Sequence, residues 1–232
     1  MDERELYRTR KRKARLAGAC FLVVAFAAWP EMLRASLFAM GDAAATGRNI
    51  LGSEALLRWS VAGDIVTELA FLCTALFLYS LLEEVGRGLA RAMLALVAIA
   101  VGMTVFNTGA ELAALGAFLA GEQAQGMLLL RLYQALAIPI GLLFGLWMLP
   151  FGYLVFKSGF MPKALGMLLM TLGSSGYMAD ALLRILVPGA AGEILLVSVV
   201  AEVAAILWLL VFGVKRPRGE RPGYGHRAAS SS

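Results

Sequence analysis

Six long apolar stretches alternate with short polar segments along this chain of 232 residues. They cover about residues 16–40, 54–82, 89–119, 127–156, 164–187 and 193–214. Each is near or above the length of about 20 residues that a helix needs to cross the hydrocarbon core of a bilayer. The pattern therefore predicts an all-α polytopic membrane protein, with six transmembrane helices in one bundle over residues 16–214.

Composition agrees with this class. The chain is 60% hydrophobic and 16% charged, and its mean hydropathy is +0.76. A soluble domain could not hide that much apolar surface, so the lipid bilayer is the first expected partner. Cys20 and Cys73 both lie inside apolar stretches, where a structural disulfide is not expected.

Basic residues gather in segments that fall on one side of a six-span topology. Sixteen of the 21 Lys and Arg lie in residues 1–15, in the turns near Arg87 and Lys157, and in residues 215–232. The positive-inside rule places that side, with both termini, in the cytoplasm. We expect residues 1–15 to be a basic arm at anionic headgroups and 215–232 a disordered basic tail, in a bacterial cytoplasmic (inner) membrane. Nothing aromatic or folded beside the arm supports nucleic-acid binding.

The stretch 54–82 combines a membrane-spanning length with four charged residues, Glu54, Arg58, Asp64 and Glu68. At 100° per residue they share one helix face, an arc of about 120°. A charge near the middle of a membrane helix costs about 2.5–3.5 kcal/mol, so this face must meet protein or water. Ser53 is the expected N-cap of the helix, with Glu54 in its first turn.

Other polar residues also fall in the outward half of the expected bundle. Helical spacing predicts pairs of Glu31 with Arg34, Glu54 with Arg58 and Asp180 with Arg184, and Glu111 is a candidate partner for Arg131. We infer a polar cavity or charge network that opens outward and is deepest at Asp64, Glu68 and Glu202. The candidate ligand- or ion-binding residues are Glu54, Arg58, Asp64, Glu68, Glu111, Arg131, Asp180, Arg184 and Glu202. The alternative is that these groups only hold the helices together.

Familiar catalytic and metal-binding constellations do not occur in the sequence. The one histidine, His226, lies in the tail, and no cysteine cluster or phosphate-binding glycine loop is present. We therefore assign no catalytic residue, metal ligand or cofactor, although an acidic site for Na⁺, Mg²⁺ or Ca²⁺ stays open. Gly141 and Gly145 form a GxxxG pattern that would suit a homodimer interface.

Two segments also resemble a known family. They are GDAAATGRNILGSEALLRWSVAGDI, from Gly41, and LLFGLWMLPFGYLVFKSGFMPKALGMLLMTLGSSGYMAD, from Leu142. The chain from about Ala14 to Val214 resembles the bacterial six-span membrane proteins grouped as domain of unknown function 4386. The resemblance implies a six-helix inner-membrane protein and no particular activity. Trp147 and the pair Leu149–Pro150 depart from the smoothly apolar pattern of that family. Residues that match its motifs are Gly41, Asp42, Asn49, Ser53, Glu54, Arg58, Asp64, Gly152, Tyr153, Ser158, Gly159, Pro162, Gly166, Gly176, Tyr177 and Asp180.

Three functions remain open at this stage. The first is a carrier- or receptor-like protein that binds a small polar ligand or cation, with Asp64 and Glu68 as carboxylate sites and Arg58 or Arg131 on an anionic group. The second is a structural or accessory membrane scaffold whose charge network only holds its own helices together. The third, which is less favoured, is an intramembrane lipid-modifying enzyme that uses an acid pair as general acid and base.

Overall fold

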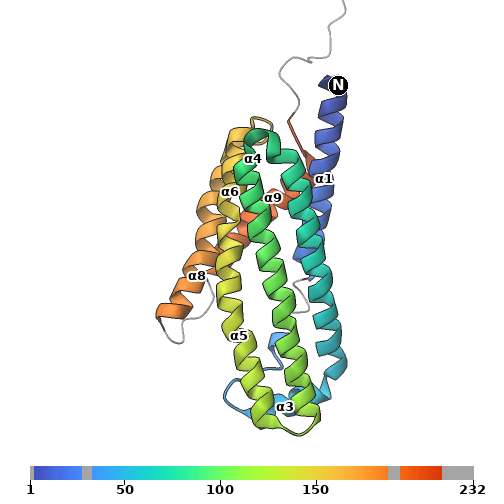
Figure 1. The fold of residues 1–232 in the computed structure, drawn as a ribbon, viewed down its shortest axis with the longest axis vertical. Coiled ribbons are helices and arrows are strands. Elements are labelled where there is room, and N and C mark those ends of the chain that lie inside the picture. Colours follow the sequence, from blue (N-terminus) through green and yellow to red (C-terminus); the bar gives the residue numbers. More distant parts are fainter. Residues whose placement is uncertain (1–2, 28–32, 188–193, 216–232) are drawn as a thin grey trace, which may run out of the picture.

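A computed structural model of the chain describes residues 3–27, 33–187 and 194–215, and all regular structure in these ranges is helical (Figure 1). The prediction of an all-α chain is therefore confirmed. Glu31, which the sequence pairs with Arg34, and residues 216–232 of the predicted tail lie outside the described residues.

The longest helix, α4 (Glu54–Leu119), folds back on itself. Its backbone leaves the helical region at Gly86, where φ is −172° and ψ is 90°. Figure 1 shows the chain reversing direction there, between the cyan and green halves of α4. Each half is about 48 Å long at 1.5 Å per residue, which exceeds the thickness of a bilayer core. The turn expected after Leu82 thus lies at Gly86.

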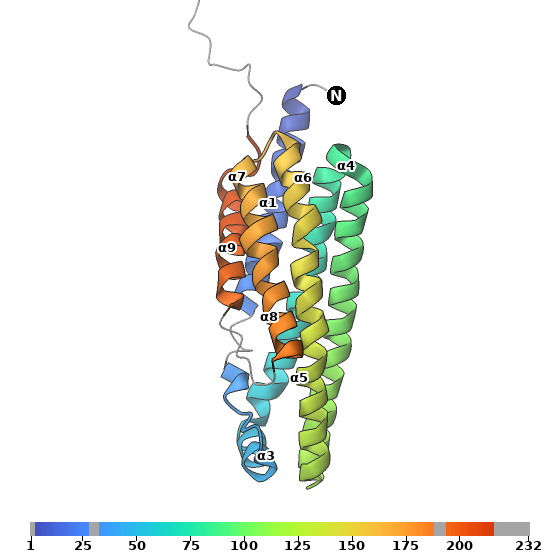
Figure 2. The same cartoon turned by 90° about the vertical axis from the view of Figure 1, so that its left-hand side faces the viewer.

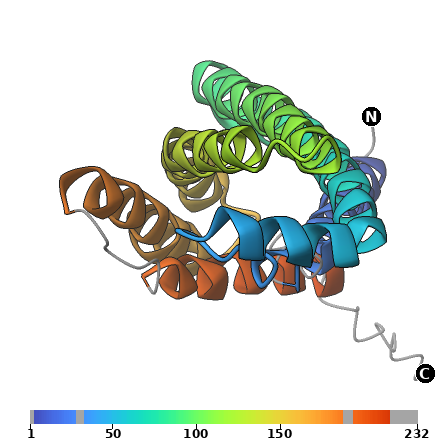
Figure 3. The same cartoon turned by 90° about the horizontal axis from the view of Figure 1, so that it is seen from below.

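The remaining helices pack against α4 or against the helices that contact it (Figure 2). α5 (Gln123–Leu146) and α6 (Met148–Ser158) join through Trp147, which keeps helical angles of −67° and −26°. α7 (Lys163–Leu168), the π-helix η1 (Leu169–Gly173) and α8 (Ser174–Leu186) also form one rod, because the backbone keeps helical angles at both junctions. α1 (Glu3–Ala27) packs on α4 and α9 (Leu195–Val211). The short helix α3 (Ala43–Gly52) lies across the foot of the bundle, seen from below in Figure 3.

Among the described residues, two helices are long and apolar enough to cross a membrane by length and composition. They are the folded-back α4 and the continuous rod Gln123–Ser158 formed by α5 and α6. A shorter apolar helix covers Leu196–Val211.

One expectation about local structure needs correction, the capping of α4 by the side chain of Ser53. The connection before residue 54 forms α3, and Asp42 caps this helix by accepting a hydrogen bond from the backbone N–H of Ala45 at 2.8 Å. Ser53 precedes α4 but makes no side-chain capping bond, and its own N–H donates to the carbonyl of Ile50. A single residue thus joins the two helices. The expected basic arm is also helical from Glu3 onward, as the first part of α1.

The apolar side chains form two separate clusters. The larger is centred on Trp147, which contacts Phe71 edge to face and stacks on Phe151, with ring centroids 5.2 Å apart in both pairs. Trp147, a departure from the family pattern, is thus a core residue. The smaller cluster lies under α3 and includes Ile50, Leu57 and Phe118.

Glycines allow two of the helical segments to approach closely. A β-carbon at Gly166 would lie 2.6 Å from the carbonyl oxygen of Gly152, and one at Gly152 would lie 2.7 Å from that of Gly166. Gly145, from the predicted GxxxG pattern, also faces the interior, because its β-carbon would lie 2.9 Å from the carbonyl oxygen of Ser174. This glycine packs α5 against α8 within the chain, and therefore is not free for a dimer interface.

We expect Gly166→Ala to lower the free energy of unfolding by about 1–3 kcal/mol, because the added methyl group must push the backbones of α6 and α7 apart. Gly102→Ala is the matched control, since a β-carbon there meets nothing within 4 Å. Denaturant unfolding of the two variants in detergent measures the difference. Equal stability of both would contradict the close packing at Gly166.

Candidate functional site

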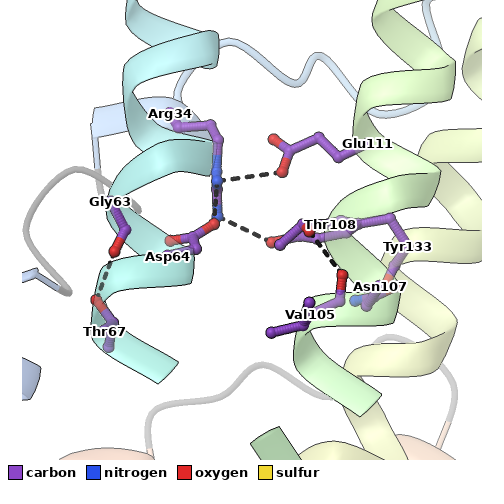
Figure 4. Close-up of polar contacts among 9 residues, drawn as sticks. All are labelled: Arg34, Gly63, Asp64, Thr67, Val105, Asn107, Thr108, Glu111 and Tyr133. Atoms are coloured by element: carbon purple, nitrogen blue, oxygen red, sulfur yellow. Dashed lines mark hydrogen bonds and ion pairs between the residues drawn. The ribbon is translucent and has the colours of Figure 1, made fainter. Parts of the chain in front are cut away.

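A polar layer separates the two apolar clusters. On the first half of α4, Asp64 lies between Leu57 of the smaller cluster and Phe71 of the larger one. On the second half, Asn107 and Glu111 lie between Val101 and Ala114 in the same way. These positions converge because the two halves of α4 run antiparallel, which brings residue 64 level with residues 107–111 (Figure 4).

Arg34 occupies the centre of this layer. Its Nη1 donates to Oδ2 of Asp64 at 2.6 Å and lies 3.1 Å from Oε2 of Glu111. The side chain of Arg34 is 2% exposed and that of Glu111 is fully buried. Asp64 is 13% exposed, and therefore is the member of the group closest to solvent.

An aromatic and an amide side chain complete the group. Nη2 of Arg34 donates to the phenol oxygen of Tyr133 at 3.0 Å, and its guanidinium carbon lies 5.8 Å from the centre of that ring. Asn107 donates from Nδ2 to the backbone carbonyl of Tyr133 at 3.0 Å. We call Arg34, Asp64, Glu111, Tyr133 and Asn107 the Arg34 cluster. It connects the segment after α1 with both halves of α4 and with α5.

The Arg34 cluster holds more acidic than basic groups. One guanidinium faces the carboxylates of Asp64 and Glu111. Glu68 follows Asp64 by one helical turn and is also buried, with 6% of its surface exposed. An ionised carboxylate is costly in an apolar interior unless a positive charge or a proton compensates it. The cluster is therefore suited to take up a proton or a small cation.

The remaining predicted residues on α4, α5 and α8 lie nearer the surface. Arg58 pairs with Glu54 at 2.7 Å, and Arg184 pairs with Asp180 at 2.8 Å, which confirms both predicted pairs. Their arginine side chains are 54% and 42% exposed, respectively. Arg131 is exposed, and the ion pair of Glu111 is made with Arg34.

Glu202 belongs to a different part of the bundle. It accepts a hydrogen bond from the phenol of Tyr177 at 2.9 Å, and its helix α9 packs on α1, η1 and α8. Nearby, the hydroxyl of Ser198 donates to the carbonyl of Gly173 at 2.7 Å, where η1 interrupts regular α-helical bonding. The expected grouping of Glu202 with Asp64 and Glu68 stays a prediction, since the contact established for Glu202 is with Tyr177 of α8. Within the described ranges, no three His, Cys, Asp or Glu side chains are arranged to hold a metal ion.

Sequence reasoning did not select the central residue. Local spacing pairs Arg34 with Glu31, whereas the fold brings Arg34 to Asp64 and Glu111, which lie on the two halves of α4. The available signal was an isolated arginine between Leu33 and Leu37, with no other basic residue nearby to make it a topology signal. Tyr133 gave no signal of its own.

We expect Arg34→Gln to lower the free energy of unfolding by about 3–5 kcal/mol, because it leaves buried carboxylates without their cation. Arg58→Gln, which breaks an exposed pair on the same helix bundle, should cost less than about 1 kcal/mol. Denaturant unfolding in detergent, followed by circular dichroism, compares the two. A similar loss in both variants would show that the burial of Arg34 has no special energetic role.

Comparisons with known proteins give a family and no activity. A family described as a domain of unknown function, DUF4386, matches residues 16–213. An uncharacterized protein from Archaeoglobus fulgidus is 43% identical over 72 residues, which are 31% of this chain and 43% of that relative. The chain thus matches less than half the length of this archaeal protein. No solved structure matches the chain. Since the family match covers most of the sequence, the chain belongs to the DUF4386 family.

Proposed function

We propose that this chain is a carrier- or receptor-like protein of the bacterial cytoplasmic (inner) membrane that binds a small polar ligand at the Arg34 cluster. A proton or a small cation is the ligand that the cluster suits best. The protein would span the membrane six times, with both termini in the cytoplasm and the Arg34 cluster in the outward half.

The exposed surface supports a membrane location. Only 28% and 33% of the most apolar windows of the two long helices are buried inside the protein. Phe106, Leu186 and Leu196 expose 76%, 73% and 71% of their surfaces, respectively. Helices that are apolar on their outer faces as well as their inner faces are suited to lipid.

The helical rods support the number of spans and their orientation. The two halves of α4, the rod of α5 and α6, the segment from α7 to α8, α1 and α9 give six rods in the described part of the chain. Basic residues from distant segments meet at one end, where Arg10 of α1 and Lys157 of α6 line the same cavity. Arg10 also pairs there with Glu84, and Lys13 donates to the carbonyl of Ser80 at 3.0 Å. The positive-inside rule assigns that end to the cytoplasm.

The charge balance of the Arg34 cluster carries the proposed binding function. Replacing a buried ion pair by apolar residues is often neutral or stabilising, so structural needs alone give little reason to keep two acids around one arginine. Ionisable groups inside a membrane protein are expensive and usually mark a ligand, ion or proton site. Asp64 is the more exposed of the two carboxylates in the cluster, and therefore is the acid that a ligand would meet first.

A scaffold function is the second candidate, and one observation favours it. The smaller apolar cluster, with Ile50 of α3 and Phe118 of α4, lies between the Arg34 cluster and the foot of the bundle. This arrangement covers the expected outward opening. In a scaffold, the Arg34 cluster would only hold α4, α5 and the segment that follows α1 in register.

Cation-dependent stability separates the two candidates. Thermal unfolding of the purified protein is measured with Na⁺, K⁺, Mg²⁺ or Ca²⁺ at constant ionic strength. Bound protons are detected by mass spectrometry after treatment with dicyclohexylcarbodiimide, which reacts with protonated carboxyls in apolar surroundings. We expect either a cation-specific rise in unfolding temperature or labelling of Asp64, Glu68 or Glu111.

One variant and one control complete this test. Glu111→Gln removes one acid and balances Arg34 against Asp64, and therefore should abolish the cation response or reduce labelling of the remaining acids severalfold. Arg58→Gln should leave both readouts unchanged. If the wild-type protein shows neither response while Glu111→Gln folds normally, the scaffold function is the correct one.

A further inference from the structure

A second polar site lies at the opposite end of the bundle from the Arg34 cluster. A cavity of about 550 Å³ opens where α1, the reversal of α4 and the end of α6 meet. Its walls include Arg10 of α1, Glu84 of α4, and Tyr153 and Lys157 of α6. This is also the end that collects basic residues from distant segments of the chain.

The cavity carries a net positive charge. Arg10 forms an ion pair with Glu84, so these two walls balance one another. Lys157 makes no ion pair within the described ranges, and its ammonium lies 5.7 Å from the centre of the Tyr153 ring. One positive charge is therefore left to face an entering ligand. Compact ammonium groups of this kind bind phosphate well.

The lining combines charged and aromatic side chains. Tyr153 is 42% exposed and lines the cavity beside Lys157. Phe160 also lines the cavity, and the guanidinium of Arg10 lies 5.3 Å from the centre of its ring. A phosphate ester that continues into an apolar group fits such a lining better than a free inorganic anion does, because the aromatic faces would otherwise stay uncovered.

The walls are held in place by contacts outside the cavity. Lys13 donates to the carbonyl of Ser80 at 3.0 Å, which fixes α1 against α4. The backbone N–H of Lys215 donates to the carbonyl of Phe160 at 2.7 Å, which fixes the loop after α6. A site whose walls are already ordered loses less entropy when a ligand binds.

We propose that this cavity is a binding site for the phosphate of an anionic phosphodiester, with an anionic phospholipid headgroup as its occupant. Lys157 would pair with the phosphate, Tyr153 and Phe160 would cover the glycerol portion, and the acyl chains would lie along the outside of the bundle. A water-soluble phosphate ester shares this chemistry and is separated from the lipid by experiment. The site is distinct from the Arg34 cluster, and either assignment can fail without the other.

Lipid binding to the purified full chain tests the proposal. Delipidated protein in non-ionic detergent is titrated with dioctanoyl phosphatidylglycerol, dioctanoyl phosphatidylcholine or glycerol phosphate, and the dissociation constant is measured by calorimetry. We expect phosphatidylglycerol to bind more tightly than phosphatidylcholine. Lys157→Gln should weaken its binding about tenfold, as expected for losing about 1.4 kcal/mol of a charged hydrogen bond. Lys157→Arg should keep most of the affinity.

Lys163→Gln is the matched control. Lys163 carries the same charge at the same end and also lies over an aromatic ring, 5.5 Å from the centre of Phe156, but it does not line the cavity. Its loss should change the affinity less than twofold. Binding of glycerol phosphate that depends on Lys157 would support the phosphate site and identify a soluble source. Equal effects of Lys157→Gln and Lys163→Gln, or equal affinities for the two lipids, would overturn the proposal.

Discussion

A guanidinium between the buried carboxylate of Glu111 and the partly exposed carboxylate of Asp64 is the interaction on which the lower half of the bundle depends. Charges of opposite sign attract strongly where water is scarce, but each must first be removed from water at a cost of several kcal/mol. Arg34 meets this cost through the bonds to Asp64 and Tyr133 and its proximity to Glu111. If Arg34 moved away, the carboxylates of Asp64 and Glu111 would remain without their cation.

The position of this group explains the layered organisation of the fold. The large apolar cluster around Trp147 and the small one under α3 would pack equally well in several registers, because apolar contacts have little directionality. The Arg34 cluster allows one register, since the two halves of α4 must bring Asp64 and Glu111 to the same guanidinium. The polar contacts thus fix the register of helices that the apolar contacts hold together. The opposite end has surface ion pairs such as Arg10 with Glu84, and pairs of this kind contribute only about 0–1 kcal/mol to stability.

Sequence alone could predict the helices, the family and the local pairs, but not the centre of the site. Apolar runs of about 20 residues and i,i+4 spacing are local signals, so the pairs of Arg58 and Arg184 follow from them. The partners of Arg34 are 30 and 77 positions away, and they depend on the reversal at Gly86 and on how the segment after α1 returns to the bundle. Depth along a helix predicts a similar level for Asp64 and Glu202, but it does not predict their partners, which are Arg34 for Asp64 and Tyr177 for Glu202.

The most direct test of this account is a double-mutant cycle on Arg34 and Glu111. Free energies of unfolding are measured for the wild type, Arg34→Gln, Glu111→Gln and the double variant under identical detergent conditions. Contact across the buried layer predicts a coupling energy of about 1–3 kcal/mol, with the double variant more stable than the sum of the single losses implies. Additive effects, within about 0.5 kcal/mol, would contradict the claim that Arg34 neutralises Glu111 inside the bundle.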